Sequence, residues 1–275
     1  MLDSFVFENH LGQRFEGLPN GVYLNYSDLR DYSWSYDTIN DRISRFHMST
    51  RSRKIPLVVK GKTDDEAVKT LNRLHELAEA DIVAKIPGKI FVGDYYTNGY
   101  ITASAKSNYL LKKTICNIEL TLTSDDPAWY RERTYVFVSG EEATIGIGGT
   151  DYPYDYAYDY VLALKGKKVA NNAVGESAFR LLIYGEVTNP SVIIGGHTYT
   201  VNGTVGQGET LLIDGISKTI TLTTASGNKI NWFDKRGREG YIFAPLPAGQ
   251  HTASWSGNFG FDLTVIEKRS EPRWI

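Results

Sequence analysis

Residues 53–80, RKIPLVVKGKTDDEAVKTLNRLHELAEA, join a strand pattern to the clearest helix pattern in the chain. Thr63 and Glu66 form a capping box, in which each side chain can accept a hydrogen bond from the other residue's amide. Apolar residues then recur every three or four positions, at Ala67, Leu71, Leu74 and Ala78, with Val68 and Leu77 beside them. This spacing predicts a helix over 64–80 that packs its apolar stripe against a sheet.

Strand patterns flank this helix on both sides. The run 55–59 contains Pro56, which is typical of an edge strand or of a strand's first residues. After the helix, alternating or β-branched runs predict strands at 82–86, 89–92, 100–105 and 110–122. Turn dipeptides, Pro87-Gly88 and Asn98-Gly99, separate them. The first domain is therefore expected to be mostly β, with one helix, and to end near residue 133 after the polar segment 124–130.

A low-complexity segment follows the first domain. Residues 151–160 read DYPYDYAYDY, a strict two-residue period that places the tyrosines on one side if the chain is extended. Two interpretations stay open. Residues 134–165 are a linker laid along a surface, or the rings form a partner-contact strip made of Tyr152, Tyr154, Tyr156 and Tyr158.

Residues 166–275 have the pattern of an antiparallel β domain. Short candidate strands lie at 179–184, 191–194, 198–201, 210–214, 219–223, 241–243, 251–255 and 261–267. Glycine-containing turns such as Gly195-Gly196 and Asp214-Gly215 separate several of them. Even spacing of this kind indicates a sandwich or jelly roll, and no helix is expected in this half.

Composition limits the classes of function. The 275 residues suffice for two domains, and a formal net charge of −2 gives no overall attraction to nucleic acid or to an anionic membrane. Eighteen tyrosines against eleven phenylalanines favour sheets and partner surfaces, because tyrosine buries a ring while its hydroxyl stays hydrated.

The single cysteine and the hydropathy pattern give two further expectations. Cys116 excludes an intramolecular disulfide, and its strand-like surroundings favour a small buried side chain over a reactive thiol. The N-terminal residues show no signal-peptide pattern, and no apolar run is long enough to cross a bilayer. The chain is expected to fold in a cytoplasm without membrane insertion.

No motif for catalysis, for a cofactor or for a metal stands out. The five histidines are isolated along the chain, and no His-x-x-x-His pair is present. Neither a Gly-x-Ser-x-Gly elbow nor a phosphate-binding lysine loop occurs. The glycine-rich stretches 146–149 and 203–208 precede no helix, so they are interpreted as turns. The sequence therefore predicts a non-enzyme without cofactors.

Two groups of residues remain as candidate contact sites. One is a basic cluster, which is either a solvated surface or a contact with another subunit or an anionic polymer: Arg42, Arg45, Arg51, Arg53 and Lys54. The other is Trp232 with Trp255, whose indoles either fill the core or stack on sugar rings.

Several segments in this order resemble the distal tail protein family of siphophages that infect Gram-positive bacteria. The matching segments are 1–7, the strand and capped helix over 51–80, TLTSDDPAW at 121–129, YPYDY at 152–156, GEVTNPSVII at 185–194 and LPAGQH at 246–251. The resemblance implies an N-terminal β-sandwich with one helix, followed by a galectin-like β-sandwich.

The resemblance to this family also implies a role in assembly, without a catalytic site. Members of the family form a hexameric ring through the N-terminal domain, between the tail tube and the tail tip or tail-associated lysin. Their outer domains carry host-adsorption parts, and DNA is only passing cargo. The expected location is the virion tail. The alternatives are a carbohydrate-binding module for host cell-wall glycans and, less favoured, a cell-wall hydrolase.

Overall fold

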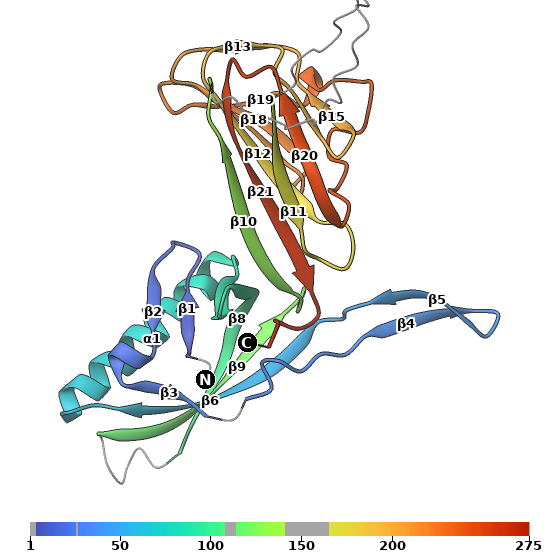
Figure 1. Cartoon of the computed structure of the whole chain (residues 1–275). Helices are drawn as coiled ribbons and strands as arrows, with labels where there is room; N and C mark the ends of the chain where they lie inside the picture. The colour runs from blue at the N-terminus through green and yellow to red at the C-terminus, as the bar shows by residue number, and fades with distance from the viewer. Residues whose placement is uncertain (1–3, 26, 108–113, 141–164, 275) are drawn as a thin grey trace, which may run out of the picture. The chain divides into compact units, whose positions relative to one another are not determined.

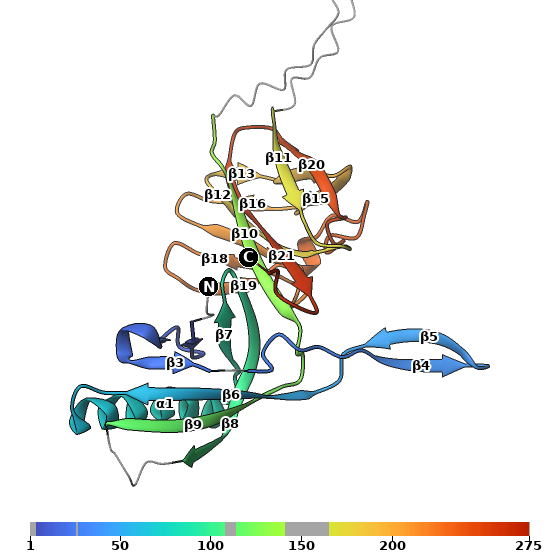
Figure 2. The same cartoon turned by 60° about the horizontal axis from the view of Figure 1, so that its bottom comes forward.

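The computed structural model describes residues 4–25, 27–107, 114–140 and 165–274. The chain divides into two compact units (Figures 1 and 2): Met1–Arg131 with Lys268–Ile275 form unit 1, and Glu132–Glu267 form unit 2. Residues 268–275 therefore belong to unit 1, although they follow unit 2 in the sequence. A single domain boundary drawn along the sequence does not assign them this way. The described residues are mainly β with one α-helix, as the sequence predicted.

Unit 1 is built on antiparallel strands in the order β3-β6-β9-β8-β7-β1-β2. Their bounds are β1 (Val6–Glu8), β2 (Arg14–Glu16), β3 (Val22–Leu24), β6 (Arg51–Lys60), β7 (Gly88–Val92), β8 (Tyr95–Ser107) and β9 (Ile115–Ser124), with a 3₁₀ turn η1 (Leu18–Asn20) before β3. The strand β10 (Trp129–Phe137) starts in unit 1, where Tyr130 pairs with Tyr96 of β8. The helix α1 (Asp64–Ala84) packs along β6 and β8 (Figure 2).

Alternation along the long strands fills the core of this unit. In β6 every second side chain from Arg53 to Val59 is buried, and in β9 the same holds from Cys116 onward. The helix contributes Ala67, Leu74, Leu77 and Ala78. Most of the predicted apolar stripe therefore faces the sheet, but Leu71 is only half-buried and the prediction for Val68 is wrong, since its side chain is 45% exposed.

The start of α1 confirms the capping threonine and corrects its partner. The Thr63 hydroxyl accepts from the Glu66 amide at 3.2 Å. The Glu66 carboxylate accepts from the Lys62 amide at 2.7 Å, one residue earlier than the capping box requires. The first of these bonds satisfies an amide of the first helical turn, which has no acceptor within the helix.

We expect Thr63→Ala to lower the free energy of unfolding of unit 1 by about 1 kcal/mol, because the Glu66 amide loses its acceptor. Thr63→Ser keeps the hydroxyl and serves as the matched control. Chemical denaturation followed by circular dichroism measures both. Equal stability of the two variants would contradict the role of the cap.

The end of α1 corrects a strand prediction. Residues 82–86 are not a strand: the helix continues to Ala84, and Lys85 closes it in the left-handed conformation at φ 56°. The Lys85 and Ile86 amides donate back to the carbonyls of Ile82 and Asp81. These helical hydrogen bonds outweigh the strand preference of the β-branched pair Ile82-Val83.

Unit 2 is an antiparallel β-sandwich, as expected. One sheet has the order β19-β18-β17-β12-β21-β10, and the other has the order β11-β20-β14-β15. Their bounds are β11 (Lys165–Asn171), β12 (Ala178–Tyr184), β14 (Ser191–Ile194), β15 (His197–Thr200), β17 (Thr210–Asp214), β18 (Thr219–Thr223), β19 (Lys229–Asn231), β20 (Gly249–Trp255) and β21 (Gly260–Arg269). A small pair, β13 (Val187–Thr188) with β16 (Thr204–Val205), completes the pairing. Buried side chains from both sheets form one core.

One strand predicted in this unit is wrong. Residues 241–243 lie in a turn, where Ile242 and Phe243 are buried although they belong to no strand. Within the described part of unit 2 the only helical segment is a single 3₁₀ turn, η2 (Phe233–Lys235).

None of the helices in the described residues is long and apolar enough to cross a membrane.

A hairpin that the sequence analysis did not predict extends from unit 1. It consists of β4 (Ser35–Ile39) and β5 (Arg42–His47), which pair only with each other. Asn40 and Asp41 form the turn, both with positive φ, as the favoured two-residue hairpin turns require. Figures 1 and 2 both show it projecting from the unit, and we call residues 35–47 the β4–β5 arm.

Candidate interaction surfaces

The two sides of the β4–β5 arm differ in chemistry. Tyr36 pairs with Phe46 and Thr38 pairs with Ile43, and Tyr36 and Thr38 are two positions apart on β4, so these four side chains share one side. The register shift lies in β5, where Ser44 is the extra residue, so β4 keeps its two-residue alternation. The other side carries Ser35, Asp37, Ile39, Arg42, Arg45 and His47. The arm therefore has an uncharged side with two aromatic rings and a side that carries both of its arginines.

The uncharged side of the arm is open to solvent. Tyr36, Ile43 and Phe46 are 59%, 53% and 58% exposed. The rings of Tyr36 and Phe46 meet edge to face, with centroids 6.5 Å apart. Such a group of exposed large side chains is typical of a surface that another molecule covers.

The structure separates the predicted basic cluster. Arg42 and Arg45 share one side of the arm, whereas Arg51 and Lys54 lie on β6. Lys54 forms an ion pair with Glu119 of β9, with its Nζ 2.9 Å from the carboxylate. These four cations do not form one patch.

Arg53 corrects the prediction of five surface cations. Its side chain is 1% exposed, and it donates to the Pro127 carbonyl at 2.8 Å. Its guanidinium also lies 5.8 Å from the centre of the Trp129 ring. Burial, and then the positive charge of Arg51, lower the pKa of Arg53 to about 10, so the group stays charged at neutral pH. Arg53 therefore holds β6 to the 127–129 segment and is not available to a partner.

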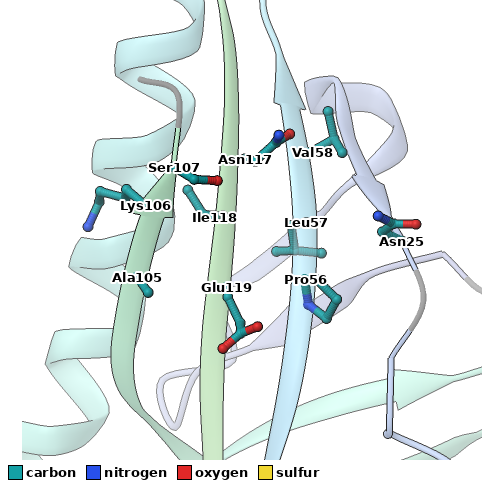
Figure 3. A pocket seen from close by; sticks show the side chains of 10 residues that line it. All are labelled: Asn25, Pro56, Leu57, Val58, Ala105, Lys106, Ser107, Asn117, Ile118 and Glu119. Atoms are coloured by element: carbon teal, nitrogen blue, oxygen red, sulfur yellow. The ribbon is translucent and has the colours of Figure 1, made fainter. Parts of the chain in front are cut away.

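An open hollow of about 480 Å³ lies over the outer side of β6, β8 and β9 (Figure 3). Its charged lining residues are Lys106 and Glu119, and Glu119 is paired with Lys54. Small or uncharged side chains such as Pro56, Val58 and Asn117 make up most of the rest. The lining contains no histidine, cysteine or second carboxylate with which to build a catalytic group.

Metal-ligand geometry is likewise missing from the described ranges. Among those residues, no three or more His, Cys, Asp or Glu side chains come together to hold an ion. Within these ranges, a buried contact between two possible ligand types joins only His10 and Asp81, whose Nδ1 and Oδ1 lie 2.7 Å apart. The His10 amide donates to the same oxygen at 2.8 Å, so this pair joins the β1–β2 turn to α1.

Both candidate carbohydrate-binding indoles are core residues. Trp255 is 3% exposed, and its Nε1–H donates to the Phe259 carbonyl at 3.0 Å. Trp232 is 6% exposed and has the Lys235 ammonium 3.9 Å from its ring centre. A Cβ on Gly203 would lie 2.9 Å from the same indole. Neither ring presents a free face to a sugar, so the structure does not support these residues as a carbohydrate site.

The tyrosine strip, Tyr152, Tyr154, Tyr156 and Tyr158, lies outside the described residues and stays a prediction. The exposed surface that sequence reasoning missed is the arm. Its signals were the Asn40-Asp41 turn and the aromatic residues at 36 and 46.

Comparison with solved structures relates the whole chain to bacteriophage proteins. One match is the Dit protein of phage SPP1, which is described as a paradigm of the hub adsorption apparatus in phages infecting Gram-positive bacteria. The two sequences are 13% identical. The structures superpose with a TM-score of 0.57 over 96% of this chain and 99% of the Dit chain. This chain has the same fold. A chain of the phage P2 baseplate in its calcium-activated conformation gives a TM-score of 0.62 at 11% identity, over 99% of this chain and 100% of the other.

The strontium form of the same baseplate gives 0.61 at 12% identity, again over 99% of this chain and 100% of the other. No protein-family model and no curated protein matches the sequence. The resemblance to distal tail proteins that the sequence suggested is therefore confirmed at the level of the fold, over both units.

Proposed function

We propose that this chain is the structural hub of a bacteriophage tail tip. The observation that carries the proposal is the full-length likeness in fold to a phage hub protein and to a phage baseplate chain. The likeness includes both units, so it reflects more than one common β-sandwich. The described residues add to this support, because unit 1 exposes large apolar side chains that a neighbouring subunit could cover.

In this role unit 1 forms a ring, six copies in the form we propose. A closed ring needs a heterologous contact, in which one surface of each chain meets a different surface of the next. A permanent contact of this kind buries roughly 2,000 Å² or more in total. Unit 1 would supply this contact area from surfaces that are not buried in its own core, among them the β4–β5 arm.

The ring joins the tail tube to the tail-tip or tail-associated lysin proteins, and unit 2 carries parts used in host adsorption. The protein would reside in the virion tail, and DNA would pass it as cargo. A formal net charge of −2 suits this role, because a strongly basic channel would retain DNA through its phosphates. The alternative of a glycan-binding module is not proposed, since its two candidate indoles are buried.

Light scattering and negative-stain images of the full chain test the hub proposal, first alone and then with the tail-tube and tail-tip proteins of the same phage. We expect rings with the mass of six chains, alone or once the tail partners are added. A chain that stays monomeric at high concentration and forms no ring with either partner would contradict the proposal.

A further inference from the structure

Two partly exposed aromatic rings of unit 2 pack against a buried one. Tyr241 is 59% exposed and Phe233 is 37% exposed, whereas Phe243 is 3% exposed. The rings of Tyr241 and Phe243 meet edge to face with centroids 5.8 Å apart, and the rings of Phe233 and Phe243 are stacked with centroids 6.1 Å apart. Large exposed rings in such a group are typical of a surface that another molecule covers.

A cation is held against each of the two exposed rings. The Lys218 ammonium lies 5.7 Å from the centre of the Tyr241 ring, and it donates to the Phe243 carbonyl at 3.3 Å. The Arg236 guanidinium lies 4.2 Å from the centre of the Phe233 ring, and it donates to the Phe233 carbonyl at 2.9 Å. Attraction between a cation and a ring holds both groups in place. We call Lys218, Phe233, Arg236 and Tyr241 the aromatic–cation surface of unit 2.

The turn that carries Lys218 is fixed by hydrogen bonds of its own. Lys218 lies between β17 and β18 and has a positive φ of 57°. The Asp214 carboxylate accepts from the Ile216 and Ser217 amides at 2.8 and 3.2 Å. The same turn leaves Ile216 49% exposed, two residues before Lys218. A surface that is ordered before binding loses little conformational entropy when a partner covers it.

The local charge is opposite in sign to the charge of the whole chain. Residues 229–241 contain four cations and two carboxylates, and Lys218 adds a fifth cation, although the formal net charge of the chain is −2. Lys218 has no ion pair among the residues that the structure describes. Arg236 pairs with Asp234 at 3.9 Å, and the Asp234 side chain is fully exposed. These cations are therefore poorly neutralised within unit 2 and favour an acidic partner.

We propose that the aromatic–cation surface binds another protein of the virion through an acidic patch that contains apolar side chains. Carboxylates of the partner lie against Lys218 and Arg236, and its apolar side chains pack on the rings of Phe233 and Tyr241. The inference rests on the proposed function, because it names the surface by which unit 2 carries a host-adsorption protein. A polymer of phosphate groups fits less well, since both cations already donate to a carbonyl and Ile216 adds an exposed apolar side chain.

The inference is tested by biolayer interferometry of the full-length chain against each purified host-adsorption protein of the same phage. Tyr241→Ala should weaken the binding at least about tenfold, because it removes the most exposed ring of the surface. Tyr241→Phe keeps the ring and is the matched control, so its affinity should stay within about threefold of wild type. Both variants should melt like wild type, since the changed side chain is exposed.

Charge reversal gives a second readout. Lys218→Glu should weaken the binding about tenfold, and the remaining affinity should depend less on salt concentration, because a cation that faces carboxylates is lost. Lys168→Glu is the matched control and should bind like wild type. Lys168 is exposed on β11, whereas the Tyr241 carbonyl is hydrogen-bonded to His197 of β15, at the opposite edge of the same sheet.

The outcomes separate this inference from the proposed hub. Rings that form with the tail partners, without binding of any adsorption protein, would overturn the inference and leave the hub standing. Binding that is unchanged in Tyr241→Ala and Lys218→Glu would overturn it as well. So would binding of this surface to polyglycerol phosphate, used as a model wall polymer, without binding to any of the proteins. Absence of rings would remove the hub, whatever this surface binds.

Discussion

Replacing Leu74 with aspartate is expected to unfold unit 1. Leu74 is fully buried on the side of α1 that faces the sheet. Removing its side chain alone costs about 2–5 kcal/mol. Placing an unpaired carboxylate there adds a further penalty of several kcal/mol. Together these approach the whole stability of an ordinary domain, about 5–15 kcal/mol.

Thermal melts followed by circular dichroism, with limited proteolysis to assign fragments, measure the effect. Unit 2 has its own core and should keep its transition. Asn72→Asp adds the same charge two residues away on an exposed position, and it should change the free energy of unfolding by less than about 0.5 kcal/mol. A Leu74→Asp protein that melts like wild type would show that the assigned inward face of α1 is wrong.

The elements that were predicted correctly are those whose bounds depend on residues close together in the sequence. The start of α1 follows from Thr63 and from an apolar stripe within one stretch of sequence, and the structure has both. Strands such as β12 and β18 were predicted close to their true bounds, because turn residues mark their ends. Burial of Cys116 also followed from its place in a strand.

The features that the sequence analysis missed depend on contacts between residues far apart in the chain. The helix passes through 82–84 because its hydrogen bonds continue and because Asp81 is held by His10, which is 71 positions away. The return of residues 268–275 to unit 1 is likewise a tertiary feature. The β-branched Ile82 and Val83 pointed to a strand only when considered alone.

Arg53 is different, because the sequence contained the signal. It alternates in step with Ile55, Leu57 and Val59, so the period of two already places it on the inward side of β6. Grouping it with its basic neighbours hid this alternation. The β4–β5 arm lacks such a clean period, since the irregularity after Asp37 shifts one strand by one residue.

The second large effect is expected in unit 2, from Trp255→Ala. The buried indole packs edge to face against the stacked rings of Phe137 and Phe261, and the centroid of each phenylalanine ring lies 5.3 Å from the centroid of the indole. Truncation opens a large cavity and leaves the Phe259 carbonyl without its Nε1–H donor. We expect a loss of about 3–5 kcal/mol in the free energy of unfolding of unit 2, measured by chemical denaturation.

Trp255→Phe refines this prediction, because it keeps much of the ring packing and removes only the hydrogen bond and part of the volume. Its loss should be clearly smaller than that of the alanine variant. A sugar-binding indole would behave in the opposite way, since either substitution would leave stability intact and abolish binding to cell-wall glycans. Unit 2 stability that is unchanged in Trp255→Ala would therefore contradict the core role of this residue and reopen the glycan-binding alternative.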